Sequence, residues 1–183
     1  MKIFILDGTD NRSDSNMSAY LKSLKAKLES LGHVVVWMRL KDMDIKYCTG
    51  CWSCWVKTAG ECVFKDDSHE VCRQSINSDL VIMASPVVMG FPTALLKKAQ
   101  DKMIPLVHPY MEIDQGEIHH IKRYERYPYI ALILEKLKDT DNKDIALIDK
   151  MYQRFALNMK SKLVFTKLIS NGLEEVVNEI DAI

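Results

Sequence analysis

Four of the five cysteines in this chain lie within one short segment. Two-residue gaps separate the first three, and a seven-residue gap leads to the fourth: Cys48, Cys51, Cys54 and Cys62. Three thiolates spaced in this way can converge from one tight turn, and the fourth can reach back to complete the set. This geometry suits three corners of a [4Fe–4S] cluster plus a closing ligand. The spacing therefore predicts a metal–thiolate site at these four residues.

Other uses of these cysteines stay open. Free or redox-active thiols are one alternative, and zinc is another, although zinc normally binds two cysteine pairs that lie further apart. Trp52 and Trp55 lie between the cysteines, where they either shield a cluster from water or pack against neighbouring structure. Cys72 stands apart on the apolar face of a predicted helix, and we expect it to be a small buried hydrophobic residue.

A loop rich in hydroxyl and amide side chains follows the first predicted strand. It runs from Gly8 to Ser18 and leads into the N-terminus of a predicted helix. Backbone N–H groups, the helix dipole and short hydroxyl donors make such a loop suitable for an anion. It has neither the G-x-G-x-x-G of a dinucleotide site nor the G-K-[ST] of a P-loop, so a phosphomonoester such as that of FMN is the better match. The alternative is that its residues only form turns and caps, and Asp10 and Asp14 disfavour an anion site unless they point outward.

The elements that must position these residues follow from hydrophobic periodicity. Five short apolar runs predict strands, at 2–6, 33–37, 80–84, 129–134 and 163–165. Apolar residues at helical spacing predict helices between and after them, and Ser85-Pro86 is expected to end the third strand. Strands that alternate with helices indicate a parallel sheet that is covered on both faces. We therefore predict a single doubly wound α/β domain over 1–183, with a cysteine-rich loop at 48–62 and an insertion at 104–128.

The insertion is rich in aromatic and basic side chains. One interpretation is a lid over a flavin, with Lys122 or Arg123 binding the phosphates of NAD(P)H. The other, which we favour, is a dimer contact or a surface excursion that is satisfied by its own ion pairs. His119 and His120 have no cysteine or carboxylate at supportive spacing, so we assign them neither a metal nor a catalytic role.

Composition limits the possible partners. The 183 residues include 25 basic and 25 acidic side chains, and this neutral balance argues against a nucleic-acid-binding protein. No apolar run approaches the roughly 20 residues that a membrane-spanning helix requires. The chain reaches Asp7 after only a few apolar residues, too soon for a signal peptide. We expect a soluble cytoplasmic protein with neither nucleic acid nor membrane as a partner.

Three segments resemble the NADPH-dependent FMN reductases and iron–sulfur flavoproteins, which share the flavodoxin-like fold. They are Gly8-Thr9 through Ser15-Asn16, the cysteine loop with Lys65-Asp66-Asp67, and 85–90 followed by Leu96-Lys97 and Asp101-Lys102. Together these segments span about the first 100 residues of the chain. The resemblance implies a flavodoxin-like three-layer fold with a five-stranded parallel sheet in the order 2-1-3-4-5 and helices on both faces.

The same resemblance implies where FMN binds. Its phosphate would be held by Thr9, Arg12, Ser15, Asn16 and the backbone of Met17 and Ser18. Its isoalloxazine ring would be wrapped by the backbone of Pro86, Val87, Val88, Met89, Gly90 and Phe91. The cysteine segment is similar to the compact motif of iron–sulfur flavoproteins.

The chain departs from the family pattern at three places. Asp10 replaces a proline, and Val88 stands where an aromatic ring often flanks the flavin. The fourth predicted strand runs into Glu135-Lys136-Leu137-Lys138-Asp139, where relatives usually place a glycine-rich loop against the flavin. Either the flavin is bound more loosely here, or the insertion supplies the missing wall.

The resemblance implies an FMN-dependent NAD(P)H oxidoreductase. It would accept a hydride from NAD(P)H and pass electrons to a small-molecule or protein acceptor, through a [4Fe–4S] cluster if one is present. No catalytic side chain is expected, because the flavin carries the chemistry. The alternatives are a one-electron carrier flavoprotein without nicotinamide turnover, and a flavin-free cysteine-rich metal or interaction module. Relatives also imply a homo-oligomer, either a homodimer or a tetramer.

Overall fold

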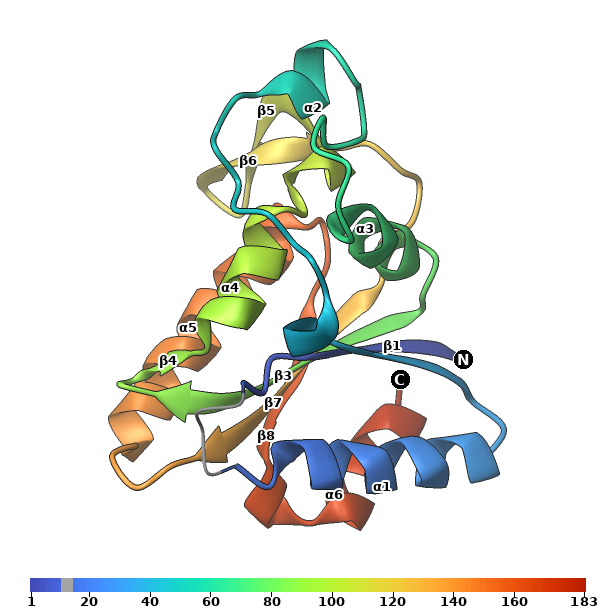
Figure 1. Ribbon diagram of the computed structural model, residues 1–183, viewed down its shortest axis with the longest axis vertical. Coiled ribbons are helices and arrows are strands. Elements are labelled where there is room, and N and C mark those ends of the chain that lie inside the picture. Colours follow the sequence, from blue (N-terminus) through green and yellow to red (C-terminus); the bar gives the residue numbers. More distant parts are fainter. Residues whose placement is uncertain (11–14) are drawn as a thin grey trace.

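The computed structural model describes residues 1–10 and 15–183, and these form a mainly parallel sheet with helices on both faces (Figure 1). Its parallel strands lie in the order β2-β1-β3-β7-β8. Their bounds are β1 (Lys2–Asp7), β2 (Val34–Arg39), β3 (Leu80–Val88), β7 (Tyr129–Lys136) and β8 (Leu163–Leu168). The five predicted strands are thus present in the implied order. A sixth strand, β4 (Phe91–Pro92), pairs antiparallel with β3 and was not predicted.

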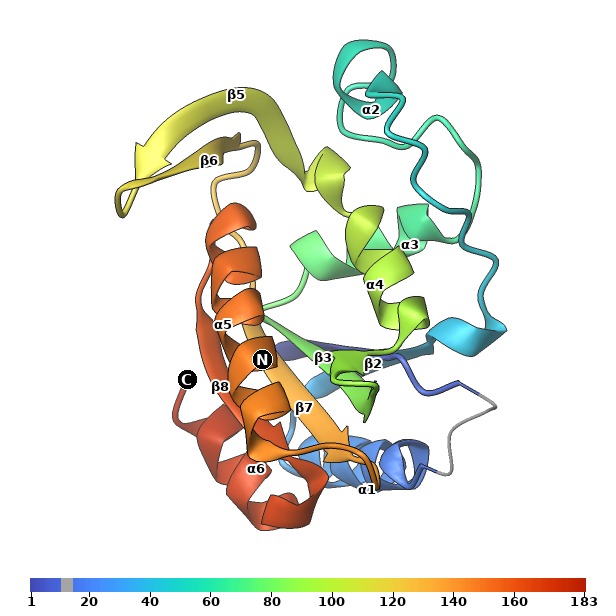
Figure 2. The same cartoon turned by 90° about the vertical axis from the view of Figure 1, so that its left-hand side faces the viewer.

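The helices divide between the two faces of this sheet. Figures 1 and 2 show α1 (Met17–Ser30) and α6 (Leu173–Asp181) on one face, and α3 (Ser68–Ile76), α4 (Ala94–Asp101) and α5 (Asn142–Asn158) on the other. This confirms the doubly wound α/β fold. Shorter helical elements connect the layers: η1 (Leu40–Asp42), α2 (Ser53–Val56), η2 (Ile104–Leu106) and η3 (Ile169–Asn171).

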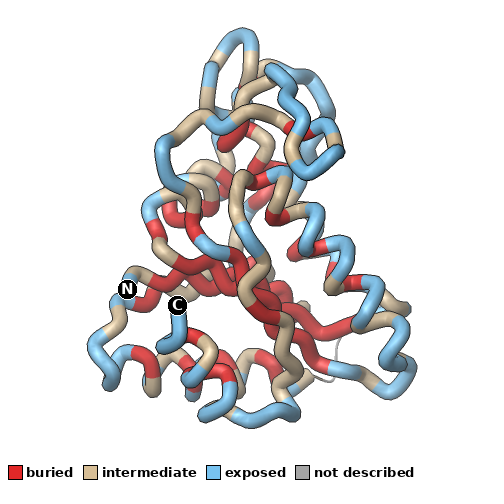
Figure 3. The backbone as a smooth tube through the Cα atoms, turned by 180° about the vertical axis from the view of Figure 1, so that it is seen from behind, coloured by how far each residue is buried: buried red, intermediate tan, exposed pale blue. Residues whose placement is uncertain are grey.

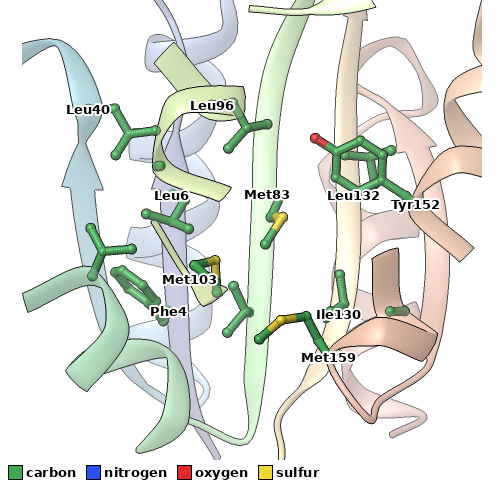
Figure 4. Close-up of a cluster of buried hydrophobic side chains, with 14 of the residues drawn as sticks. Phe4, Leu6, Leu40, Met83, Leu96, Met103, Ile130, Leu132, Tyr152 and Met159 are labelled. Carbon is green, nitrogen blue, oxygen red and sulfur yellow. The ribbon is translucent and has the colours of Figure 1, made fainter. Parts of the chain in front are cut away.

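The central strands are buried on both faces, as the red segments of the backbone show in Figure 3. Alternate side chains of β1 enter two separate cores, because successive residues of a strand point to opposite sides. Phe4 packs on the side of α3, α4 and α5, together with Leu132 and Tyr152 (Figure 4). Ile5 packs on the other side, together with Ile133 of β7. Burial on both faces explains why these strands read as continuous apolar runs.

The third strand is longer than predicted. We expected Ser85-Pro86 to end it, but β3 continues to Val88, with Pro86 opposite Glu135 of β7. The pairing with β1 stops at Ala84, so the prolyl nitrogen breaks no ladder on that side. The extension carries β3 beyond the carboxyl edge of the sheet, where it turns back into β4.

Most of the insertion forms a hairpin, β5 (Val107–Asp114) and β6 (Glu117–Lys122), which we did not predict. Ion pairs join it to the C-terminal end of α5 and the turn after it: Arg154 with Glu117, and Lys160 with Glu112. In Figures 1 and 2 the hairpin lies at the top with α2, and β4 lies at the far end of α4. Within the described part of the chain, no helix has the length and apolarity to cross a membrane.

Candidate functional site

The loop after β1 lies at the carboxyl edge of the sheet, where open α/β folds bind their ligands. Thr9 directs its backbone N–H and its hydroxyl at Oδ1 of Asp7, at 2.9 and 2.5 Å. Ser18, in the first turn of α1, donates its hydroxyl to Oδ2 of the same carboxylate at 3.0 Å. Two of the residues that we expected to bind a phosphate therefore bind a buried carboxylate.

Three further residues of this loop, Ser15, Asn16 and Met17, donate to a second carboxylate, that of Glu135. Oε1 of Glu135 accepts a hydrogen bond from the backbone N–H of Asn16 at 2.9 Å. Oε2 accepts one from the N–H of Met17 at 3.2 Å and another from the hydroxyl of Ser15. These donors hold an anion, so their chemistry fits a flavin phosphate, but the anion that they hold is part of the chain. Arg12 lies outside the described residues.

The segment expected to contact the flavin ring forms the tip of the β3–β4 hairpin. Met89 and Gly90 make its two-residue turn with φ of 51° and 79°, and positive φ at both positions is typical of a type I′ turn. Val87 is buried, while Val88, Met89 and Phe91 are exposed beside the carboxyl edge. An apolar surface of this kind fits one face of an isoalloxazine ring.

Thr93 connects this hairpin to the loop after β1. Its hydroxyl donates to the carbonyl of Gly8 at 2.6 Å and accepts from the N–H of Leu96, so it caps α4. Its backbone N–H donates to the hydroxyl of Ser85 at 2.9 Å. Gly8 has no room for a side chain, because a Cβ there would lie 3.0 Å from Leu96 Cβ. The two segments of the predicted flavin site are therefore fixed against each other.

The four clustered cysteines line one small cavity of about 70 Å³, beside α2 and η2. Cys54 is buried, Cys62 is half-buried, and Cys48 and Cys51 are exposed. Within residues 1–10 and 15–183, no set of three or more His, Cys, Asp or Glu side chains is arranged to hold a metal ion. The donor set is that of a soft metal or an iron–sulfur cluster, but binding one requires the thiols to move closer together.

The thiols of the cavity differ in acidity. Hydrogen bonds from the side chain and backbone of Ser53 lower the pKa of Cys51. Burial raises the pKa of Cys54, and the nearby thiols of Cys62, Cys48 and Cys51 raise it further. Cys72 lies outside the cavity on α3, where burial raises its pKa to about 12. Cys72 is half-buried and packs against the core on this side of the sheet, so it is less fully buried than we expected.

A buried ammonium group borders the same cavity. Lys102 Nζ lies 3.0 Å from Cys62 Sγ and 3.0 Å from Asp66 Oδ2, and the Lys102 and Asp66 side chains are 1% and 0% exposed. Burial alone would lower the pKa of Lys102, but hydrogen bonds with Cys62 and Asp66 outweigh it and raise the pKa. We predicted no role for Lys102 or Glu135 from the sequence. The signal for Lys102 was its place in the family-like Asp101-Lys102 segment, but lysine is rarely buried.

The ion pair of Asp66 predicts a specific loss of stability in acid. Burial would raise the pKa of Asp66, but hydrogen bonds from Ser68, Lys102 and backbone amides outweigh it and lower the pKa from 3.8 to about 2. A carboxyl group with a depressed pKa stabilises the fold above its unfolded pKa and loses that contribution as pH falls through its folded pKa. We therefore expect the stability gap between wild type and Asp66→Asn, measured by urea unfolding, to narrow between about pH 4 and 2.

The matched control for this measurement is Glu174→Gln, because the Glu174 side chain is 70% exposed. The difference in free energy of unfolding between Glu174→Gln and the wild type should stay nearly constant between about pH 4 and 2. An Asp66→Asn gap that is equally constant would contradict the prediction.

Trp55 connects the cysteine loop to the β5–β6 hairpin. Its indole N–H donates to the carbonyl of Val107 at 2.9 Å, and its ring lies 4.8 Å from that of His120 and 4.9 Å from that of Trp52. Arg123 donates to the carbonyls of Pro105 and Val107. Arg123 is thus engaged within the insertion, which lies at the far end of α4 from the β3–β4 hairpin (Figure 1). This placement favours a surface excursion with its own polar contacts over a lid on the flavin.

Comparisons with known proteins agree with this geometry. The family model described as NADPH-dependent FMN reductase matches residues 1–114. An iron-sulfur flavoprotein of Archaeoglobus fulgidus is 40% identical over 97 residues, which cover 53% of this chain and 43% of that protein. Iron-sulfur flavoprotein MJ0731 of Methanocaldococcus jannaschii is 28% identical over 120 residues, which cover 64% and 58% of the two chains. The matches span about half the length of these curated relatives.

Solved structures share the fold at low sequence identity. NAD(P)H:quinone oxidoreductase from Methanothermobacter marburgensis superimposes with a TM-score of 0.62 at 15% identity, covering 92% of this chain and 84% of that one. An FMN-dependent NADH-azoreductase of Bacillus anthracis, in complex with FMN, gives a TM-score of 0.62 at 11% identity, covering 91% and 84%. At these identities the comparison establishes the fold.

Proposed function

Because the chain belongs to the NADPH-dependent FMN reductase family, we propose that it is an FMN-dependent NAD(P)H oxidoreductase. One observation carries the proposal: the family match spans residues 1–114, and so includes both the loop after β1 and the β3–β4 hairpin. Among the described residues, Ser15, Asn16 and Met17 would bind the phosphate and Pro86 to Phe91 would contact the ring. The hydroxyls of Thr9 and Ser18, which we also expected at the phosphate, donate to the carboxylate of Asp7.

Bound FMN would supply the hydride and electron chemistry, and the protein would supply binding and orientation. The start of α1 offers backbone N–H groups and the positive end of a helix dipole to the phosphate. The β3–β4 hairpin, held by Thr93, offers an apolar surface to the ring. Ser85 and Thr93 act as positioning residues, because they contact the two loops and fix their separation.

We further propose that the cysteine cavity holds an iron–sulfur cluster that passes electrons to the acceptor. Support comes from the four thiols around one cavity and from the relatives named iron-sulfur flavoproteins. The ligands would be Cys48, Cys51, Cys54 and Cys62. Iron loading of the wild type and of cysteine variants distinguishes this proposal from the free-thiol and zinc alternatives.

We also propose a homo-oligomer in which the β5–β6 hairpin forms the contact surface. One face of β5 and β6 carries Met111, Ile113 and Ile118, which are 56%, 80% and 69% exposed, while the opposite face is paired with α5. A contiguous exposed apolar strip is typical of protein contacts. The cytoplasmic location stays a prediction.

Two successive experiments test the proposed function: first FMN binding, then nicotinamide turnover. Purified protein should quench flavin fluorescence on titration with FMN, and the FMN-loaded protein should oxidise NADH or NADPH in the presence of a quinone acceptor. Binding of FMN without nicotinamide oxidation would favour the one-electron carrier. No FMN binding, together with zinc and no iron by elemental analysis, would favour the flavin-free module and contradict the proposal.

A further inference from the structure

Glu135 is the carboxylate that occupies the donors at the start of α1. It is 5% exposed and accepts hydrogen bonds from the N–H groups of Asn16 and Met17 and from the hydroxyl of Ser15. The first turn of a helix stabilises an anion through its unpaired N–H groups and its dipole. In this chain that stabilisation is already used by a side chain that lies 118 residues further along from Met17.

The strand register directs Glu135 to this position. Alternate residues of β7 point to the same face of the sheet, and Ala131 and Ile133 both pack in the core formed with α1 and α6. Glu135 follows in the same alternation, two residues after Ile133, at the carboxyl edge. Its backbone is paired with Pro86 of β3, in the interior of the sheet. The carboxylate is therefore presented by a regular strand, and only its own side-chain torsions can withdraw it.

A phosphate and the Glu135 carboxylate would compete for the same N–H groups. Both are anions, and each would repel the other at the few ångströms that separate two ligands of one helix turn. The Asp7 carboxylate binds Thr9 and Ser18 on the other side of the loop, which adds to the negative charge there. A ribityl chain without phosphate carries only hydroxyl groups, which can donate to a carboxylate.

We infer that Glu135 is a specificity-determining residue that competes with the FMN phosphate for the N-terminus of α1, so that the chain discriminates little between FMN and riboflavin. This inference rests on the proposed function, because it concerns the flavin that the site accepts. Because Glu135 occupies the donors of the loop, the phosphate of FMN gains little additional affinity there.

Flavin titration of the wild type and Glu135→Gln tests this inference. Glutamine keeps the size of the side chain and removes its charge. We expect wild-type affinities for FMN and riboflavin within about threefold, and Glu135→Gln to bind FMN about tenfold more tightly, because charge-assisted hydrogen bonds then pass to the phosphate. Riboflavin affinity should change less than about twofold. Glu174→Gln, on the exposed side of α6, is the matched control and should bind both flavins as the wild type does.

Two outcomes would overturn the inference: a wild type that already prefers FMN by about a hundredfold, or a Glu135→Gln variant whose FMN affinity is unchanged or weaker. Both are distinct from failure of the proposed function, in which the wild type and the variant bind neither flavin. The wild-type comparison needs no variant and stands even if Glu135→Gln folds poorly.

Inorganic phosphate gives a readout that needs no flavin. Added phosphate should raise the thermal unfolding temperature of Glu135→Gln more than that of the wild type, at ionic strength matched with chloride, because a ligand that binds only the folded state stabilises it. An equal rise in both proteins would show that the carboxylate does not occupy the phosphate position, and would overturn the inference.

Discussion

Replacing Lys102 with methionine should lower the free energy of unfolding by about 3–5 kcal/mol, because it leaves the Asp66 carboxylate buried without its counter-charge. Methionine keeps most of the apolar volume of the lysine stem, so the loss reports on charge and not on a cavity. The ammonium lies 3.0 Å from the carboxylate, and both side chains are almost fully buried. Urea unfolding with linear extrapolation measures the change.

Lys97→Met is the matched control for this variant. Lys97 lies on α4, which ends directly before Lys102. It pairs with Asp101, but its side chain is 61% exposed. An exposed pair contributes about 0–1 kcal/mol, so this variant should remain close to the wild type. The double variant Lys102→Met with Asp66→Asn should lose less stability than the sum of the single changes, because it removes the uncompensated charge. Equal losses from Lys97→Met and Lys102→Met would contradict the prediction.

Cys54→Ser should abolish iron loading. After anaerobic incubation with ferrous iron and sulfide, we expect the wild type to bind about four iron atoms per chain and to show a broad visible absorption at about 400 nm. Serine offers a poor ligand for iron–sulfur clusters, and Cys54 is the buried member of the set. Iron analysis and the visible spectrum measure the result.

Cys72→Ser is the control for iron loading, because Cys72 lies on α3 outside the cavity, with its thiol donating to the carbonyl of Lys102 at 3.4 Å. It should load iron as the wild type does. If Cys54→Ser and Cys72→Ser load equally, or if the wild type takes up zinc and no iron, the cluster proposal is wrong.

The sheet was readable from the sequence because its physical cause is local. Strands buried on both faces must be apolar throughout, so β1 and the core of β7 appear as unbroken apolar runs. The β5–β6 hairpin was not predicted, although Met111-Glu112-Ile113-Asp114 alternates apolar and polar residues. Its charged face packs against the end of α5 through ion pairs, and its apolar face is exposed, which reverses the usual arrangement of a half-buried strand. Its turn at Gln115-Gly116 was the available signal.

The site was readable only in part. The loop after β1 and the cysteine spacing are contiguous in sequence, and the structure places them at two separate sites, at the start of α1 and beside η2. The partners of these segments are remote: Glu135 binds Asn16 across 119 residues, and Lys102 binds Cys62 across 40. No periodicity relates residues that far apart. The sequence therefore predicted no partner for Lys102 or Glu135, although both lie in segments compared with the family pattern.

Helix α4 sets the distance between the two sites. At the start of α4, the hydroxyl of Thr93 donates to the carbonyl of Gly8. Directly after the last residue of α4, the ammonium of Lys102 contacts Cys62 and Asp66. Eight helical residues span about 12 Å. Moving either end of α4 would leave a buried polar group without its partner, which costs free energy. Cys62 is therefore held in place by Lys102. If the proposed cluster binds, the exposed segment that carries Cys48 and Cys51 would have to move toward Cys62.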